Sequence, residues 1–386
     1  MRALRYYGPG DLRVKYDVPE PECLPHQVKV RPAFCGICGS DLHAYLSDKF
    51  IPLRDTPHPL TGETWPITFG HEFSGDVVAV GSDVAKNEGS VKVGDRVACQ
   101  PTICCSHCPS CKQGAVNCCD SLGFIGLMGG GGGLSDYICI DAQFAHKLSD
   151  SIPYEIGALV EPLSVAWHAV EQADVKPGDD VLVMGAGPIG LAVIQCLKAR
   201  QVDGQIIVVE LSSKRKEFAR QCGATTVLDP QDEDVVSRCR SLCGGQGPAV
   251  ALECAGVAAS INAACRAVRT KGLIVNVALW EAPVPIDMMA LLFGEKRLAS
   301  GEKEPAQNRT ITCHGTQVQI TDVSTIAVSL TASDFRAVID ALESGQLQVE
   351  GMITHKIKMD EVVHKGFEAL MKEKDTTIKV LVDVRT

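Results

Sequence analysis

The sequence predicts an α/β protein in which a doubly wound parallel sheet is inserted into a β-rich domain, and three observations support this. From Arg2 to about Cys139, short β-branched runs such as QVKVRPAFCGIC and VKVGDRVACQ are punctuated by glycine and proline, which is typical of antiparallel strands joined by loops. From Asp180 onward, apolar strand-like runs alternate with helix-length segments. The last part of the chain then returns to a mixed β and α pattern.

The alternating region predicts the strands of the parallel sheet in chain order. An apolar helical stretch, YEIGALVEPLSVAWHAVEQA, precedes them. The strand-like runs are VLVM (181–184), IIVVE (206–210), TTVL (225–228), AVALECAG (249–256) and GLIVNVAL (272–279), each separated from the next by a helical segment. Strands that alternate with helices in this way form parallel sheets covered by helices.

The end of the chain predicts a return to the first domain. DFRAVIDALESG is a helix closed by Gly345, and MITHKIK and IKVLVDV are typical of strands. We therefore expect one domain from residues 1–155 and 321–386, interrupted by a second domain at 156–300. The polar segment 301–320, GEKEPAQNRTITCHGTQVQI, has no helical period, and we expect an atypical insertion there that forms a mobile surface excursion.

Composition excludes several classes of protein. The 386 residues are 45% hydrophobic and 22% charged, which is typical of a globular chain with sizeable cores. The net charge of -10 and the lack of a basic cluster argue against nucleic acid as a partner. No apolar run suits a signal peptide or a membrane span, so we expect a cytoplasmic protein with no membrane partner. In that compartment the 18 cysteines should be reduced thiols or metal ligands.

Four cysteines predict a structural zinc site. Cys105, Cys108, Cys111 and Cys119 have the spacing CxxCxxCx7C on a loop. Four thiolates complete a tetrahedral site and leave no open position, so such a site is structural. Cys104 and Cys118 adjoin two of these residues and could shift the assignment, His107 could replace a thiolate, and an iron–sulfur cluster is an alternative for the same ligands.

A glycine motif predicts dinucleotide binding. Gly185, Gly187 and Gly190, with Pro188 and Ile189 between the last two, follow a predicted strand and open a predicted helix. Glycines there let the backbone approach a pyrophosphate at the helix N-terminus. Glu210, at the end of the next strand, can accept hydrogen bonds from the adenosine ribose and would repel a 2′-phosphate. This favours NAD over NADP, although Lys214 and Arg215 close behind could accommodate a phosphate. The other glycine run, residues 129–133, lacks a following helix and predicts a flexible turn.

The remaining motifs carry a family resemblance. CGICGSDLH, FGHEFSG, VGDRV, the four-cysteine loop, EPLSV and GAGPIG occur in this order over nearly the whole chain. The sequence resembles the zinc-dependent medium-chain dehydrogenases, a resemblance that implies a GroES-like catalytic domain and a Rossmann domain. Glu161 stands where other alcohol dehydrogenases have cysteine, which is similar to the polyol branch. The matches GICGSDLHAYL, ALVEPLSVAWHAV and NVALW resemble most the members that act on (R,R)-2,3-butanediol.

The resemblance also implies roles for single residues. Cys38, His71 and Glu161 would hold a catalytic zinc, with Glu72 as a fourth or alternating ligand. Ser40 would contact the substrate oxygen, and His43 would pass the proton to solvent. The cofactors implied are NAD and two Zn²⁺ ions, one catalytic and one structural, in a homodimer or homotetramer.

The expected reaction is the reversible oxidation of a secondary alcohol to a ketone, with 2,3-butanediol and acetoin as the first candidates. A sorbitol-type polyol dehydrogenase is the alternative within the class. A nucleotide-sensing protein without catalysis is the alternative outside it, and the intact set of Cys38, Ser40, His43, His71 and Glu161 argues against that alternative.

Overall fold

The computed structural model divides the chain into two compact units. The first unit comprises Met1–Ser164 and Leu330–Thr386, and the second comprises Val165–Ser329. The first change of unit falls later than the predicted boundary at residue 155, because helix α4 (Val160–Ala173) begins in one unit and continues into the other. The structure describes residues 1–47, 54–87, 89–280, 282–299, 310–313, 316–319, 331–373 and 375–386.

The predicted insertion at 301–320 lies largely outside the described residues. Within it, β17 (Thr310–Cys313) and β18 (Thr316–Gln319) form an antiparallel pair. The expectation that this segment is a surface excursion therefore stays a prediction.

The first unit is built mainly from antiparallel sheets. Its strands are β1 (Ala3–Gly8), β2 (Asp11–Lys15), β3 (Gln27–Gly36), β4 (Ile67–Thr68), β5 (Glu72–Val80), β6 (Arg96–Cys99), β7 (Thr102–Ile103), β8 (Gly123–Phe124), β9 (Ile138–Asp141), β10 (Ala145–Lys147), β19 (Ile353–Lys358) and β20 (Lys379–Asp383). Its other helices are α1 (Gly39–Leu46), α2 (Pro109–Lys112), α3 (Tyr154–Gly157), α10 (Ala332–Glu343) and α11 (Glu368–Lys372).

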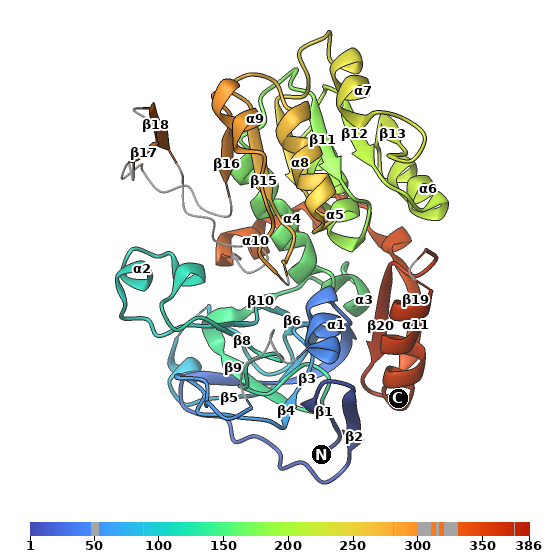
Figure 1. The fold of residues 1–386 in the computed structure, drawn as a ribbon. Helices are drawn as coiled ribbons and strands as arrows, with labels where there is room; N and C mark the ends of the chain where they lie inside the picture. Colours follow the sequence, from blue (N-terminus) through green and yellow to red (C-terminus); the bar gives the residue numbers. More distant parts are fainter. Residues whose placement is uncertain are drawn as a thin grey trace. The chain divides into compact units, whose positions relative to one another are not determined.

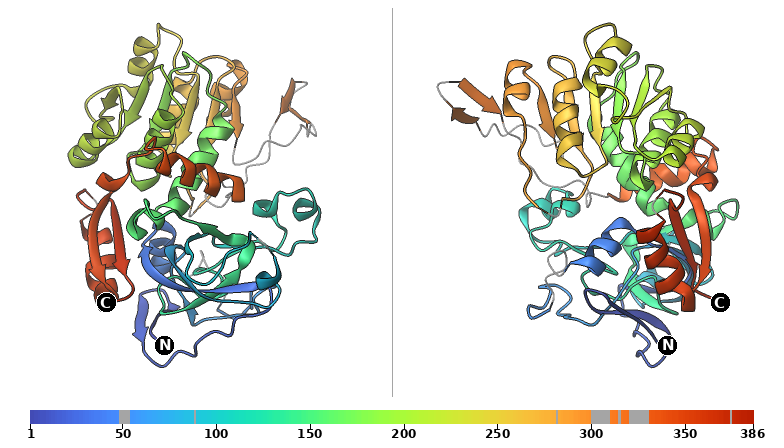
Figure 2. Two further views of the ribbon diagram at one scale, coloured as in Figure 1. Left: turned by 180° about the vertical axis from the view of Figure 1, so that it is seen from behind. Right: turned by 45° about the vertical axis from the view of Figure 1, so that its right-hand side comes forward.

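The largest sheet of this unit joins both ends of the chain. Its order is β10-β6-β5-β3-β20-β19, and β9 also pairs with β3. Strand β20 is antiparallel to β3 and parallel to β19. Figures 1 and 2 show β19, β20 and α11 side by side in every view. The C-terminal segment thus completes the sheet that the N-terminal segment begins, and it brings residues of β20 next to the end of β3.

The second unit is a six-stranded parallel sheet with helices (Figure 1). Its strands are β11 (Val181–Met184), β12 (Ile206–Val209), β13 (Thr226–Leu228), β14 (Val250–Glu253), β15 (Leu273–Asn276) and β16 (Arg297–Ala299). Its further helices are α5 (Pro188–Ala199), α6 (Ser213–Gln221), α7 (Val235–Leu242), α8 (Ala258–Ala267) and α9 (Met288–Phe293).

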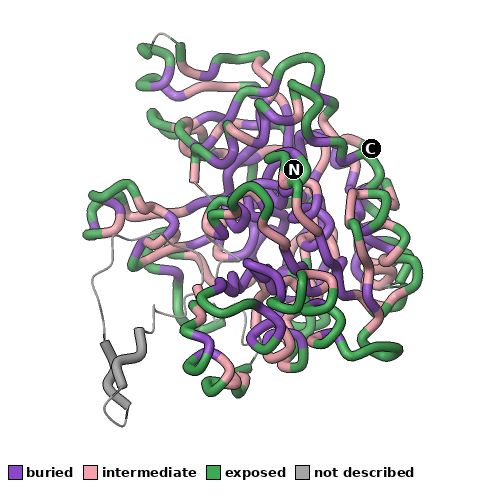
Figure 3. The backbone as a smooth tube through the Cα atoms, turned by 90° about the horizontal axis from the view of Figure 1, so that it is seen from above, coloured by how far each residue is buried: buried purple, intermediate pink, exposed green. Residues whose placement is uncertain are grey.

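The sheet order is β13-β12-β11-β14-β15-β16, so the strand order reverses beside β11, where such folds bind ligands. Every residue of β11, β12, β14 and β15 is buried. Figure 3 colours the buried parts of the chain purple and the exposed parts green. Alternate residues such as Leu182 and Ile207 pack with Cys239 and Ile261 of the helices. The predicted α/β class is confirmed.

The glycine run at 129–133 is a packed structure, which corrects its interpretation as a flexible turn. Gly131 has a φ of +83° and its carbonyl accepts a hydrogen bond from the Gly126 backbone at 2.9 Å. A Cβ at Gly133 would lie 2.5 Å from the ring of Phe73. The glycines are therefore needed for space and backbone conformation.

In the part of the chain that the structure describes, no helix combines the length and the apolar character needed to cross a membrane.

Candidate active site and metal centres

Helix α1 positions three of the predicted site residues. Cys38 immediately precedes the helix, and its backbone N–H donates to Asp41 Oδ2 at 2.9 Å, which fixes the start of the first turn. Ser40 is buried in that turn. His43 follows three residues later and therefore lies on the same side of the helix. The start of helix α1 thus holds the Cys38 thiol and the Ser40 hydroxyl close together.

His71 lies between two neighbours on α1. Its Nε2 is 3.1 Å from Ser40 Oγ, and its Nδ1 is 3.4 Å from Asp41 Oδ1. Within the described chain neither Nδ1 nor this Oδ1 has a well-aligned hydrogen bond, although both atoms are buried. Burial alone lowers the pKa of His71, but the negative charges of Asp41 and Cys38 outweigh burial and raise the pKa well above its usual value. The surroundings of the ring therefore stabilise positive charge.

Cys38, His71 and Glu72 converge on one point. Each offers a ligand atom, and these three atoms lie within 4.8 Å of one another. Thiolate, imidazole and carboxylate are the donors that zinc prefers, at bond lengths of about 2.0 to 2.3 Å. The orphaned Nδ1 facing Asp41 leaves Nε2 as the metal-facing nitrogen, an arrangement that metal-bound histidines commonly adopt. The residues present fit a zinc ion.

Glu72 is paired with a residue that the sequence analysis missed. Lys379 Nζ, on β20, donates to Glu72 Oε1 at 2.8 Å and to Oε2 at 2.7 Å, and also to the carbonyl of Ile37 at 3.3 Å. Both side chains are buried. A Cβ at Gly36 would lie 2.1 Å from Glu72 Oε2, so a glycine is required beside the pair. To serve as a zinc ligand, Glu72 would have to bind the metal through an oxygen that already accepts a hydrogen bond from Lys379.

A signal for Lys379 was present in the sequence. A lysine in the mostly apolar run IKVLVDV is expensive to bury unless an anion pairs with it. Asp41 was also missed, and its position three residues after Cys38, at the start of a helix, is typical of a capping carboxylate.

Glu161 is a second buried carboxylate in the same unit. It lies in the first turn of α4 and is 8% exposed. Burial raises the pKa of Glu161 to about 8, and the nearby charges of His71, Glu72, Lys379 and Asp41 also act on it. Among the described residues, however, the cluster of ligand atoms within 4.8 Å contains Cys38, His71 and Glu72 without Glu161. Glu161 is thus close enough to His71 and Glu72 for their charges to affect its pKa, but its oxygens are not among the ligand atoms that lie within 4.8 Å of one another.

Pro162 does not break the helix at Glu161. It occupies the first turn of α4, where a missing backbone N–H removes no helical hydrogen bond. The helix therefore continues through it and fixes Glu161 near its N-terminus.

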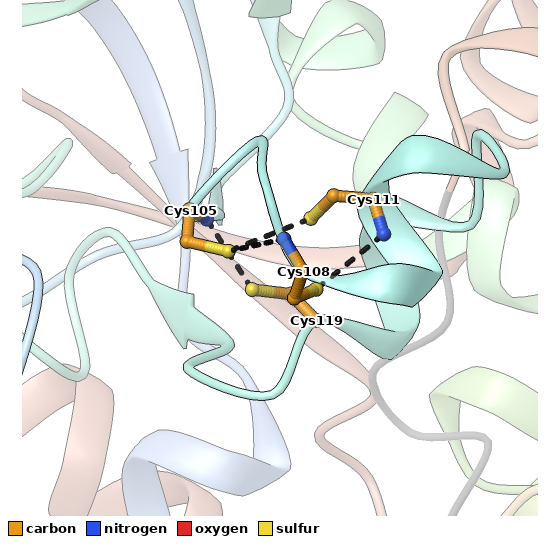
Figure 4. A group of neighbouring side chains, drawn as sticks. All are labelled: Cys105, Cys108, Cys111 and Cys119. Carbon is orange, nitrogen blue, oxygen red and sulfur yellow. Dashed lines mark hydrogen bonds between the residues drawn. The ribbon is translucent and has the colours of Figure 1, made fainter.

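The four-cysteine loop is folded around a common centre (Figure 4). The ligand atoms of Cys105, Cys108, Cys111 and Cys119 lie within 4.8 Å of one another, and the sulfurs of Cys105 and Cys111 are 4.0 Å apart. Tetrahedral zinc with bonds of about 2.3 Å would place sulfurs about 3.8 Å apart.

Backbone amides donate hydrogen bonds to three of these sulfurs, although burial raises the pKa of Cys111 and of Cys119. Cys108 N–H donates to Cys105 Sγ at 3.3 Å, and Cys105 N–H donates to Cys119 Sγ at 3.3 Å. Hydrogen bonds from the backbone of Cys111 and Asp120 lower the pKa of Cys108 to about 6. The loop therefore fits a structural zinc without the help of Cys104 or His107.

The glycine turn joins β11 to α5. Gly185 has a φ of +90°, and Gly187 and Pro188 begin the helix. A Cβ at Gly190 would lie 2.0 Å from the carbonyl oxygen of Gly185, so the helix can approach the strand only with glycine at this position. The partly buried Ile189 follows Pro188 in the first helical turn.

Glu210 lies beside this turn. Its Oε2 accepts from the Ala186 backbone at 2.7 Å, and its Oε1 accepts from Leu211 and Ser212 at 2.8 and 2.9 Å. Arg215 is close to the turn as well, since a Cβ at Gly187 would be 3.9 Å from its Nη1, and its Nε is buried with no partner in the described structure. These groups could hold the adenosine end of a dinucleotide.

The fold and the two sites define the class of protein. Residues 24–150 match the alcohol dehydrogenase GroES-like domain, and residues 188–301 match the zinc-binding dehydrogenase family. The chain belongs to the zinc-binding alcohol dehydrogenases, which confirms the resemblance and the GroES-like and Rossmann-type fold expected from its motifs.

Individual relatives narrow the class. The chain is 37% identical over 386 residues to the (R,R)-butanediol dehydrogenase of Neisseria gonorrhoeae, covering 99% of each sequence. The crystal structure of 2R,3R-butanediol dehydrogenase from Bacillus subtilis is similar with a TM-score of 0.84 and 36% identity, covering 99% of each chain. The sorbitol dehydrogenase of Bacillus subtilis is less similar, at 28% identity over 385 residues, 99% of this chain and 97% of that protein.

Proposed function

We propose that the protein is an NAD-dependent and zinc-dependent dehydrogenase that interconverts (R,R)-2,3-butanediol and acetoin. The convergence of Cys38, His71 and Glu72, with the buried Glu161 beside them, carries the proposal. The higher identity to butanediol dehydrogenases, 36–37% against 28% for sorbitol dehydrogenase, favours this substrate over sorbitol.

The metal ligands would be Cys38, His71 and Glu161, with Glu72 as a fourth or alternating ligand. These residues would hold a zinc ion that supplies Lewis-acid activation of the substrate hydroxyl, and a bound NAD would supply the hydride acceptor. Asp41 Oδ1, 3.4 Å from His71 Nδ1, would attract an N–H at that position and so leave Nε2 for the metal. Lys379 pairs with both oxygens of Glu72 and balances the charge of its carboxylate.

Proton transfer would follow α1. Ser40 Oγ lies 3.1 Å from His71 Nε2, so the hydroxyl is beside the proposed ligand and can accept the proton of the substrate. His43, on the same side of the helix, can then pass that proton toward solvent. Ser40 and His43 lie one helical turn apart on α1, so the helix fixes their relative positions.

Cofactor choice would depend on Glu210. The Ala186, Leu211 and Ser212 amides hold its carboxylate beside the glycine turn, where it can accept hydrogen bonds from ribose hydroxyls and repel a 2′-phosphate. We therefore propose NAD as the cofactor, with Arg215 contacting the adenosine side.

The decisive experiment measures NAD reduction with each butanediol stereoisomer and with sorbitol, using zinc-loaded protein. We expect the highest kcat/KM with the (R,R) isomer. A higher kcat/KM with sorbitol would favour the polyol alternative, and no turnover with any alcohol would favour the non-catalytic nucleotide-sensing alternative.

Glu161→Ala tests the proposed ligand set. The variant should lose turnover and catalytic zinc while the structural zinc stays. Glu171→Ala is a matched control, because Glu171 lies on the same helix and its side chain is 52% exposed. Full zinc content and a near-normal rate in Glu161→Ala would refute the assignment.

Two further expectations belong to this proposal. The first is a reducing, cytoplasmic location, because the four-cysteine loop would bind zinc only with its thiols reduced. A homodimer or homotetramer, implied by the family, can be tested by light scattering of the purified protein.

A further inference from the structure

Glu253, the last residue of β14, is a fully buried carboxylate near the glycine turn. Its Oε1 accepts from Ala255 N–H at 3.1 Å and from Ser260 Oγ at 2.5 Å. Gly256 N–H lies within 3.2 Å of Oε1 and 3.1 Å of Oε2. No lysine or arginine pairs with this carboxylate in the described part of the chain, so its charge is balanced by backbone and hydroxyl donors.

These hydrogen bonds fix the loop 254–257. Cys254 N–H donates to the Met184 carbonyl at 2.9 Å, which anchors the loop to the end of β11. A Cβ at Gly185 would be 3.0 Å from Ala255 Cβ, so the loop and the glycine turn are in close contact. Gly256 has a φ of +69°. A displaced loop would therefore disturb the turn that the pyrophosphate must approach.

Two carboxylates thus flank the end of β11, because the strand order is β12-β11-β14. Glu210 follows β12, is partly exposed, and accepts from Ala186 of the turn at 2.7 Å. Glu253 is 0% exposed, and its carboxylate accepts hydrogen bonds from the loop 254–257 and from Ser260 of α8. Glu210 is available to a ligand, and Glu253 is not.

We propose that Glu253 is a positioning residue for dinucleotide binding, which holds the loop 254–257 against the glycine turn without touching the cofactor. The inference rests on the proposed NAD-dependent function. Burial raises the pKa of Glu253, while Ser260, Gly256 and Ala255 lower it, so the carboxylate depends on these donors. In Glu253→Gln the amide would direct an N–H toward backbone donors, and the loop would have to move.

The test measures NADH affinity directly, by fluorescence titration of the zinc-loaded protein. We expect Glu253→Gln to raise the Kd for NADH by about ten-fold, which corresponds to about 1.4 kcal/mol. At saturating NAD, kcat and the KM for the alcohol should stay near wild type, because the zinc site is untouched. Glu233→Gln is the matched control, since Glu233 is exposed on the same unit and should leave the Kd unchanged.

Ser260→Ala is a milder second variant that keeps the carboxylate and removes one donor. It should raise the Kd for NADH by a smaller factor, and it serves as the test if Glu253→Gln does not fold. Unchanged NADH affinity in the folded variant would overturn the inference, and so would a loss of kcat without a change in affinity. If the wild-type protein binds no NADH, that result refutes the proposed NAD-dependent function and, because it rests on that function, the inference on Glu253 as well.

Discussion

Replacing Lys379 with methionine should destabilise the first unit strongly. Its Nζ donates to both oxygens of Glu72, at 2.7 and 2.8 Å, and the two side chains are 2% and 0% exposed. Methionine keeps most of the length of lysine but removes the charge. The Glu72 carboxylate would then be buried without its cation, and breaking a buried pair in this way costs about 3–5 kcal/mol.

The assay is urea unfolding of wild type and variants at equal zinc content, verified by metal analysis. Lys372→Met is the matched control: Lys372 pairs with Glu368 at the surface, its side chain is 70% exposed, and its loss should change stability by less than about 0.5 kcal/mol.

A double variant tests the physical reason. Glu72→Gln combined with Lys379→Met removes the uncompensated charge, so it should be more stable than Lys379→Met alone. A loss below about 1 kcal/mol in Lys379→Met, or strictly additive effects in the double variant, would refute the reasoning.

Three other variants test separate parts of the structure. Cys111→Ser should lower the metal content by one zinc per chain and reduce the thermal midpoint, because a closed zinc site contributes folding energy; unchanged metal content would contradict the structural site. Glu210→Ala should narrow the preference for NAD over NADP in kcat/KM, and a wild type that already uses NADP equally well would contradict the role of Glu210. Burial lowers the pKa of His146 to about 4, so the folded chain binds fewer protons than the unfolded chain between about pH 4 and 6.5. His146 should thus make stability fall as pH falls through this window, by up to about 3 kcal/mol, and His146→Gln should flatten the profile measured by urea unfolding at several pH values.

The sequence predicted the features that depend on residues close together in the chain. Four cysteines between Cys105 and Cys119 can reach a common centre by folding one loop, and the structure places their ligand atoms within 4.8 Å. The glycine turn is equally local, since strand, turn and helix follow one another directly. The strand runs at 181–184 and 272–279 were readable because a buried parallel strand is apolar along its whole length.

The zinc-ligand set was accessible from the sequence only through resemblance. Cys38, His71 and Glu161 are far apart in the chain, and nothing in their local patterns distinguishes them from packing residues. The structure brings Cys38 and His71 together with Glu72, and it leaves Glu161 at the edge of that cluster.

Other features were decided by the tertiary structure alone. Lys379 and Glu72 are 307 residues apart and meet only because β20 pairs with β3, which also pairs with β5. The hydrogen bonds of Glu253 are local, but the loop that they hold meets the glycine turn only because β14 lies beside β11. Local patterning reports which face of an element is buried, but it does not report which buried face meets which. That choice is made by long-range strand pairing and packing, and it determines whether a buried charge is paired, bound to a metal or used to hold a loop.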